Sequence, residues 1–115
     1  MLEWLWITAS DLGRGIAEGA IDPEALTKTY LDAIDAHSQQ STIYARVTRD
    51  RARAEARAAA ARAKAGQRLS LLDGVPISWK DLFDSAGTAT EAGSHLLAGR
   101  VPQRDAEVLR AASAA

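Results

Sequence analysis

The sequence predicts a helix-rich α/β fold. Caps and apolar spacing mark several helices, and two short β-prone runs, residues 43–47 and 75–80, are predicted strands. Neither run has a hairpin partner, so the two together cannot form a sheet with covered edges. The order of helices and strands therefore indicates the beginning of a larger α/β sheet.

The first two helices are predicted from their ends. The first starts near Thr8 or Ser10 and closes at Gly19, a residue that readily adopts the left-handed conformation after a helix. Residues 22–24, Asp-Pro-Glu, start the second with an N-cap oxygen, a proline and an acid near the helix dipole. We expect this second helix to end near His37.

Two further helices are expected beyond the first β-prone run. Thr48 caps the third, an alanine- and arginine-rich helix that ends near Lys64. Asp105 is predicted to cap the last helix. Residues 85–99 are rich in Gly, Thr and Ser, which indicates a loop.

Composition excludes several kinds of site. The 115 residues include no cysteine, so disulfides and thiolate metal sites are absent. His37 and His95 lack metal-ligand spacing, and we expect neither a metal nor a cofactor. The apolar residues 1–7, which include Trp4 and Trp6, are an N-terminal extension too short for a membrane span and without a basic leader. We expect a cytoplasmic protein with no membrane partner.

Positive charge is concentrated in the middle of the chain. Residues 46–68 hold eight of the 14 Lys and Arg residues, although the net charge is −1. This segment is the candidate for binding an anionic partner, and one interpretation is a non-catalytic interaction fragment with a basic helix. Few aromatic residues lie among the cations, so we favour a solvated helix face and do not expect nucleic acid as a partner.

Lys80 ends the second β-prone run. Burial at the end of a strand favours the neutral form of a lysine, and a neutral amine can act as a general base toward a serine hydroxyl. The alternative is an exposed lysine that pairs with Asp81 or Asp84. Position alone favours this second interpretation.

The motifs around Lys80 change that preference. They occur in a fixed order: Gly74-Val75-Pro76, Lys80-Asp81, Ala86-Gly87, Thr88-Ala89-Thr90, Ala92-Gly93-Ser94 and Pro102-Gln103-Arg104-Asp105-Ala106. This series resembles the amidase signature family, and the resemblance extends upstream to about Thr8. It implies that residues 8–115 are an incomplete N-terminal portion of an amidase domain, part of an α/β/α sandwich with a mixed sheet.

The resemblance also implies an activity. Family members hydrolyse carbon–nitrogen amide bonds with a nucleophilic serine, a second serine on a cis peptide and one lysine, which corresponds to Lys80 here. The two serines are expected downstream of residue 115. Neither Ser78 nor Ser94 matches them, so we expect the isolated chain to be inactive. The implied partner is a small-molecule amide, and the full-length enzyme could form a homodimer.

A second member of the same family remains an alternative. The A subunit of a glutamyl- or aspartyl-tRNA amidotransferase shares this N-terminal motif and delivers ammonia to a misacylated tRNA. The motif does not separate the two activities, and it leaves the substrate open.

Overall fold

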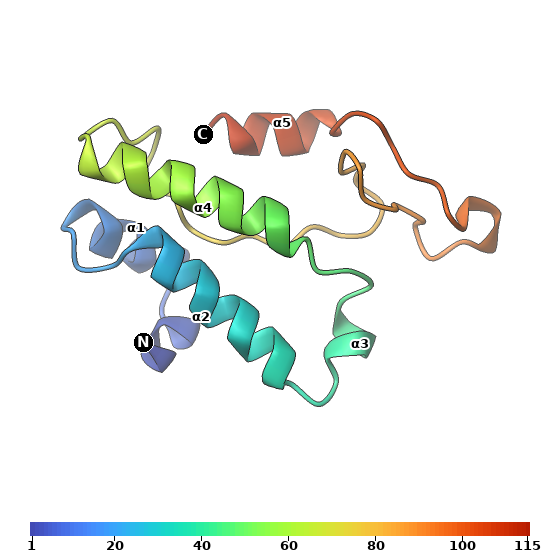
Figure 1. Ribbon diagram of the computed structural model, residues 1–115, viewed down its shortest axis with the longest axis horizontal. Helices are drawn as coiled ribbons and strands as arrows, with labels where there is room; N and C mark the ends of the chain where they lie inside the picture. Colours follow the sequence, from blue (N-terminus) through green and yellow to red (C-terminus); the bar gives the residue numbers. More distant parts are fainter. The chain divides into compact units, whose positions relative to one another are not determined.

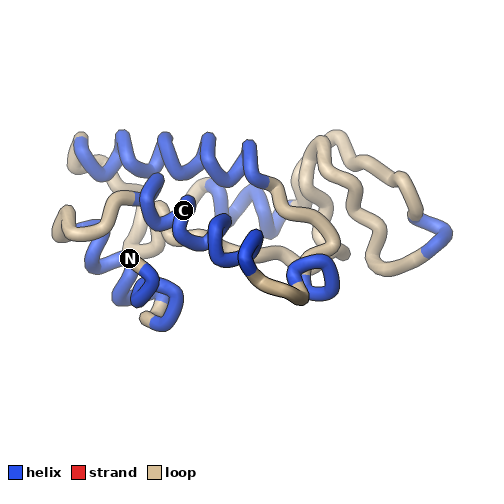
Figure 2. The backbone as a smooth tube through the Cα atoms, turned by 60° about the horizontal axis from the view of Figure 1, so that its bottom comes forward, coloured by secondary structure: helices blue, strands red, loops and turns tan.

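The computed structural model describes residues 1–115, which form two compact units, residues 1–76 and 77–115. All regular structure is helical, as Figures 1 and 2 show. The α-helices are α1 (Ala9–Ala17), α2 (Pro23–Ala36), α3 (Gln40–Ile43), α4 (Arg49–Lys64) and α5 (Glu107–Ser113), and two 3₁₀ helices span Leu2–Trp6 and His95–Leu97. The predicted richness in helix is confirmed, whereas this part of the chain shows no sheet.

The predicted starts of α1 and α2 are confirmed by their caps. The Thr8 hydroxyl accepts a hydrogen bond from the Asp11 N–H at 3.1 Å. The Asp22 carboxylate accepts one from the Ala25 N–H at 2.9 Å. Each bond satisfies one of the N–H groups that a helix leaves unpaired at its first turn. Thr48 precedes α4 as predicted, but its side chain makes no cap bond.

The core of residues 1–76 lies where α1 and α2 meet. Its buried members are Leu12, Ile16, Ile21 and Leu26, and the last is fully buried. The α2 and α4 helices pack against each other along this unit (Figure 1). Burying aliphatic side chains of this size supplies about 1.5–3 kcal/mol each, so every member of this cluster contributes to the unit's stability.

An ion pair and a close backbone contact hold the loop that follows α4. Arg62 donates to both carboxylate oxygens of Asp73, at 2.8 and 2.7 Å, and Asp73 also accepts from the Leu69 N–H. A Cβ atom at Gly13 would lie 2.1 Å from the Leu71 carbonyl oxygen, so only glycine lets the loop approach α1. The end of this unit is therefore held by tertiary contacts.

The N-terminal residues belong to the same unit. Trp4 packs against the core, and its carbonyl accepts a hydrogen bond from the Tyr30 hydroxyl at 3.2 Å. Trp6 instead is 88% exposed. No helix of the chain has the length and apolar character needed to cross a membrane.

Three local predictions were wrong. Residues 43–47 are not a strand, because the chain forms the short helix α3 and then an irregular segment. Residues 75–80 are also irregular. β-Propensity describes a fit to a sheet surface, and neither run has a neighbouring strand to pair with. Asp105 does not cap α5: Ala106 holds that position, and the Asp105 carboxylate accepts the Ala86 N–H instead.

Candidate active site around Lys80

Lys80 lies near the start of the second unit, directly after an open stretch of backbone. The N–H groups of Ile77, Ser78 and Trp79 make no hydrogen bond to another backbone group. Ile77 is 67% exposed, and Ser78 and Lys80 are also exposed. The structure therefore places the predicted base in solvent, not at the end of a buried strand.

A turn follows Lys80 at once. The Lys80 carbonyl accepts a hydrogen bond from the Phe83 N–H at 3.1 Å. The rings of Trp79 and Phe83 meet edge to face, with centroids 6.0 Å apart and planes at 73°. This arrangement suits the opposite charges of ring face and ring edge. Backbone hydrogen bonding thus resumes at Lys80.

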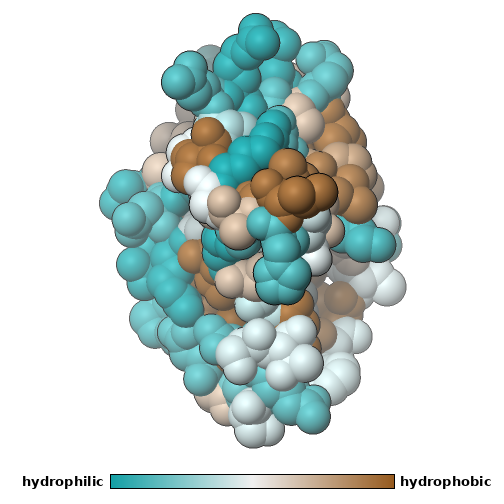
Figure 3. Space-filling model, turned by 90° about the vertical axis from the view of Figure 1, so that its right-hand side faces the viewer, coloured by the Kyte–Doolittle hydropathy of each residue, from teal (hydrophilic) through white to brown (hydrophobic).

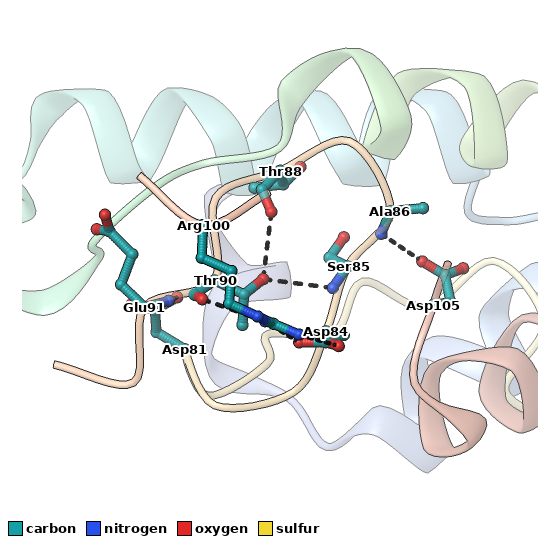
Figure 4. A network of polar contacts seen from close by, with 9 residues as sticks. All are labelled: Asp81, Asp84, Ser85, Ala86, Thr88, Thr90, Glu91, Arg100 and Asp105. Atoms are coloured by element: carbon teal, nitrogen blue, oxygen red, sulfur yellow. Dashed lines mark hydrogen bonds and ion pairs between the residues drawn. The ribbon is translucent and has the colours of Figure 1, made fainter. Parts of the chain in front are cut away.

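Asp81 contacts the turn formed by the Ala92-Gly93-Ser94 motif. Its carbonyl accepts the Ala92 N–H at 2.7 Å, and its carboxylate accepts the Glu91 N–H at 3.3 Å. Figure 4 shows Asp81 beside Glu91 at one end of a polar network. The Lys80-Asp81 motif and the residue 92–94 motif are therefore in direct contact.

Asp84 and Arg100 form an ion pair with two hydrogen bonds in this network. Both terminal nitrogens of Arg100 donate to the Asp84 carboxylate, at 2.6 and 2.8 Å, and one also reaches the Thr90 carbonyl at 3.4 Å (Figure 4). Thr90 is buried, and its N–H donates to the Arg100 carbonyl at 2.9 Å. The hydrogen bonds from Arg100 hold the pKa of Asp84 below its ordinary value.

The last motif, residues 102–106, is bonded to the segment of residues 84–87. The Asp105 carboxylate accepts the Ala86 N–H at 2.8 Å. Two backbone bonds lie beside it, from Ala106 to the Asp84 carbonyl and from Gly87 to the Pro102 carbonyl, both at 2.9 Å. Residues 81–87 are thus bonded to residues 91–92 and 100–106. The motifs that are separate in the sequence form one cross-linked loop.

Ser94 has a structural role in this unit. Ser94 caps the 3₁₀ helix His95–Leu97, because its hydroxyl accepts the Leu96 N–H at 3.3 Å. No group of three or more His, Cys, Asp or Glu side chains is placed to hold a metal ion.

The described residues match a known family. The family model for amidases matches residues 25–115, which include Lys80 and the whole network that follows it. The chain belongs to the amidase family.

Several similar proteins are much longer than this chain. The A subunit of the glutamyl-tRNA(Gln) amidotransferase from Anaeromyxobacter sp. (strain K) is 44% identical over 105 residues, which cover 91% of this chain and 21% of that protein. The corresponding protein of Streptomyces coelicolor is 33% identical over 115 residues, 100% of this chain and 23% of that protein. That of Chloroflexus aggregans is 38% identical over 109 residues, 95% and 22% respectively.

This amidase-family chain therefore spans about a fifth of the length of these relatives. No solved structure gives a significant match to it. Within the family match, sequence reasoning identified Lys80, Asp81 and Asp105 as motif residues but did not find Arg100. The Asp84–Arg100 pair joins positions 16 apart in the chain, a spacing that no helical or strand periodicity marks.

The basic helix of this amidase-family chain is partly neutralised. Of the six cations of α4, Arg49 pairs with Asp35 of α2, Arg51 pairs with Glu55, and Arg62 pairs with Asp73. The Arg51–Glu55 bond, at 2.8 Å, links residues one helical turn apart. Carboxylates thus already occupy guanidinium groups that an anionic partner would need, which favours the solvated helix face.

Proposed function

We propose that this chain supplies Lys80 as the general base of an enzyme that hydrolyses a carbon–nitrogen amide bond. The observation that carries the proposal is the family match, which spans Lys80 and the cross-linked loop behind it. The family resemblance implies a Ser–cisSer–Lys mechanism. We propose that both serines come from residues beyond the 115 of this chain, since its amidase relatives are about five times longer.

The proposed chemistry needs a neutral amine. The lysine takes a proton from the bridging serine, which takes one from the nucleophilic serine, and the serine oxygen attacks the amide carbonyl. The tetrahedral intermediate collapses, the C–N bond breaks, and the leaving nitrogen receives a proton. Water then releases the acid from the acyl-enzyme. Lys80 is exposed in this chain, so the surroundings that would exclude water from it belong to the rest of the enzyme.

The same proposal accounts for the open backbone before Lys80. Ile77, Ser78 and Trp79 offer unpaired N–H groups in an irregular segment of β-prone residues. Figure 3 shows hydrophobic side chains at the molecular surface on one face. In residues 77–115 the exposed hydrophobic residues include Ile77, Leu82, Leu96 and Val101. We expect the segment to pair as a strand within an α/β/α sandwich that the complete enzyme forms with a mixed sheet.

A second candidate is the A subunit of a tRNA amidotransferase. It is favoured by the relatives, because those described above carry that name at 33–44% identity. In that case the nitrogen released from the amide passes to a tRNA-linked acceptor, and the enzyme works with other subunits. A cytoplasmic location fits both candidates.

The test is a chimera in which this chain replaces the aligned 105 residues of the Anaeromyxobacter protein. We expect ammonia release from simple amides, glutamine included, and a loss of at least about 1,000-fold in kcat/KM for Lys80→Ala. Lys80→Arg should also be inactive, because a guanidinium stays protonated. Arg104→Ala, which changes a cation outside the network, is the matched control. Full activity of Lys80→Ala would refute the proposal.

A separate measurement distinguishes the two candidates. The chimera is given the other subunits of the amidotransferase and misacylated tRNA, and nitrogen transfer to the tRNA is followed with a labelled amide. Transfer supports the A-subunit candidate. Ammonia release without transfer supports a hydrolase.

A further inference from the structure

We propose that Asp81 is a positioning residue for Lys80, which fixes the main chain of the base by holding the turn at residues 91–94. This inference rests on the proposed function of Lys80. It depends on contacts made inside residues 77–115.

Asp81 holds the turn with two different groups. Its carbonyl accepts the Ala92 N–H at 2.7 Å, and its side-chain carboxylate accepts the neighbouring Glu91 N–H at 3.3 Å. Two bonds to consecutive N–H groups restrict both the position and the rotation of the Asp81 peptide.

The turn is held in a strained conformation. Ala92 is the only non-glycine residue with a positive φ, at 52°, and Gly93 follows at 65°. A left-handed alanine is unfavourable because of its Cβ atom, and it persists where its surroundings hold it. Here the surroundings are the bond from Ala92 to Asp81 and the bond from the Ser94 N–H to the Glu91 carbonyl at 2.8 Å. The residue with the positive φ is thus the one whose N–H donates to Asp81.

The turn is itself anchored on its far side. The Glu91 carboxylate accepts a hydrogen bond from the Gly99 N–H. The adjacent Thr90 donates its N–H to the Arg100 carbonyl, and the Arg100 side chain pairs with Asp84. Figure 4 shows Thr90, Arg100 and Asp84 at the centre of this network. Asp81 is therefore bonded to a part of the loop that makes several further hydrogen bonds.

The three residues on the N-terminal side of Lys80 make no comparable hydrogen bonds. The N–H groups of the three residues before it make no backbone hydrogen bond, while its own carbonyl accepts the Phe83 N–H. Consecutive Cα atoms lie about 3.8 Å apart, so a shift of Asp81 moves Lys80 with it. A misplacement of about 1 Å can lower a catalytic rate by about 100-fold.

The test compares Asp81→Ala with Asp81→Asn, which keeps a side-chain oxygen able to accept the Glu91 N–H. In the 115-residue chain, amide hydrogen exchange at Glu91 reports the bond to Asp81, and ¹⁵N relaxation at Lys80 reports the motion of the base. In the active chimera described above, kcat and KM report its effect. Glu107→Ala removes an exposed carboxylate outside the network and is the matched control.

We expect Asp81→Ala to speed Glu91 exchange by about 3- to 10-fold, the loss of one hydrogen bond, and to increase the motion of the Lys80 N–H. In the chimera kcat should fall by about 10- to 100-fold, with KM within about 2-fold of the parent value. Asp81→Asn should restore all of these values. If Asp81→Ala does not fold, unchanged kcat and Lys80 relaxation in Asp81→Asn support the acceptor role, and a loss there overturns it.

Two further outcomes separate this inference from the function on which it rests. Unchanged kcat in Asp81→Ala, in a chimera that still loses activity with Lys80→Ala, overturns the positioning role and leaves the proposed function intact. A parent chimera without activity refutes the proposed function. In that case the ¹⁵N relaxation of Lys80 alone tests whether Asp81 restricts the Lys80 main chain. Unchanged Lys80 motion in the Asp81→Ala chain overturns that role.

Discussion

Arg100 holds the Asp84 carboxylate with both of its terminal nitrogens, at 2.6 and 2.8 Å, although the two residues are 16 positions apart in the chain. This pair joins the segment after Lys80 to the segment before α5, and both residues lie outside regular helices. Unit 77–115 depends on such polar contacts because many of its hydrophobic residues are exposed. Its order should therefore respond to the charge of the carboxylates.

Acid should loosen the loop of residues 81–106. The pKa of folded Asp84 lies below its ordinary value, because Arg100 stabilises the carboxylate. Its contribution to stability is therefore present above about pH 4 and is lost as the pH falls through the lower folded value. Amide exchange at Thr90, followed from about pH 6 to about pH 2.5 and corrected for the intrinsic rate, should show increasing opening. Asp84→Asn should open the loop at every pH and abolish this part of the pH dependence.

Asp73→Ala should destabilise residues 1–76 by about 2–3 kcal/mol, because it leaves Arg62 without its partner and removes an acceptor for the Leu69 N–H. The side chain of Asp73 is 4% exposed. Asp35→Ala is the matched control: it breaks the more exposed pair with Arg49 and should cost less than about 1 kcal/mol. Urea unfolding measures both. Equal losses would contradict the importance of burial.

Ala92→Gly should stabilise the turn by up to about 1 kcal/mol, because glycine adopts a positive φ without a Cβ clash. Ala92→Val should destabilise it, since a β-branched side chain fits this backbone poorly. Amide exchange at Ser94 in the two variants measures the effect. Faster exchange in Ala92→Gly than in the parent would show that the alanine is not strained.

The isolated chain should not hydrolyse amides. A base without its nucleophile performs no acyl transfer, and neither Ser78 nor Ser94 matches a catalytic serine of the family. Purified chain incubated with aryl and alkyl amides should release no more product than buffer. Hydrolysis that disappears in Lys80→Ala would contradict this prediction.

The basic helix α4 should bind nucleic acid weakly or not at all. Arg49, Arg51 and Arg62, half of the six cations of α4, are engaged with carboxylates and are less available for phosphate contacts. Filter binding to tRNA at decreasing salt measures any affinity, and Arg53→Glu with Arg57→Glu is the comparison. Strong binding at low salt that this double variant abolishes would revive the interaction-fragment interpretation.

The helices were predictable because their signals are local. Thr8 and Asp22 lie within three residues of the N–H groups that they cap, so the short-range pattern is enough to place α1 and α2. The two predicted strands failed for the opposite reason. A strand is completed only by a neighbour, and residues 43–47 and 75–80 have none in this chain.

The sequence by itself determined the positions of α1, α2 and α4 and the resemblance to amidases, with Lys80 in the position of the family lysine. Only the tertiary structure decided that Asp84 pairs with Arg100 and that Asp105 holds the Ala86 N–H instead of capping α5. It also decided that Lys80 is exposed and is followed by an anchored turn. The physical reason is range: a cap acts over about three or four residues, whereas a carboxylate has several partners within reach once the loop has folded.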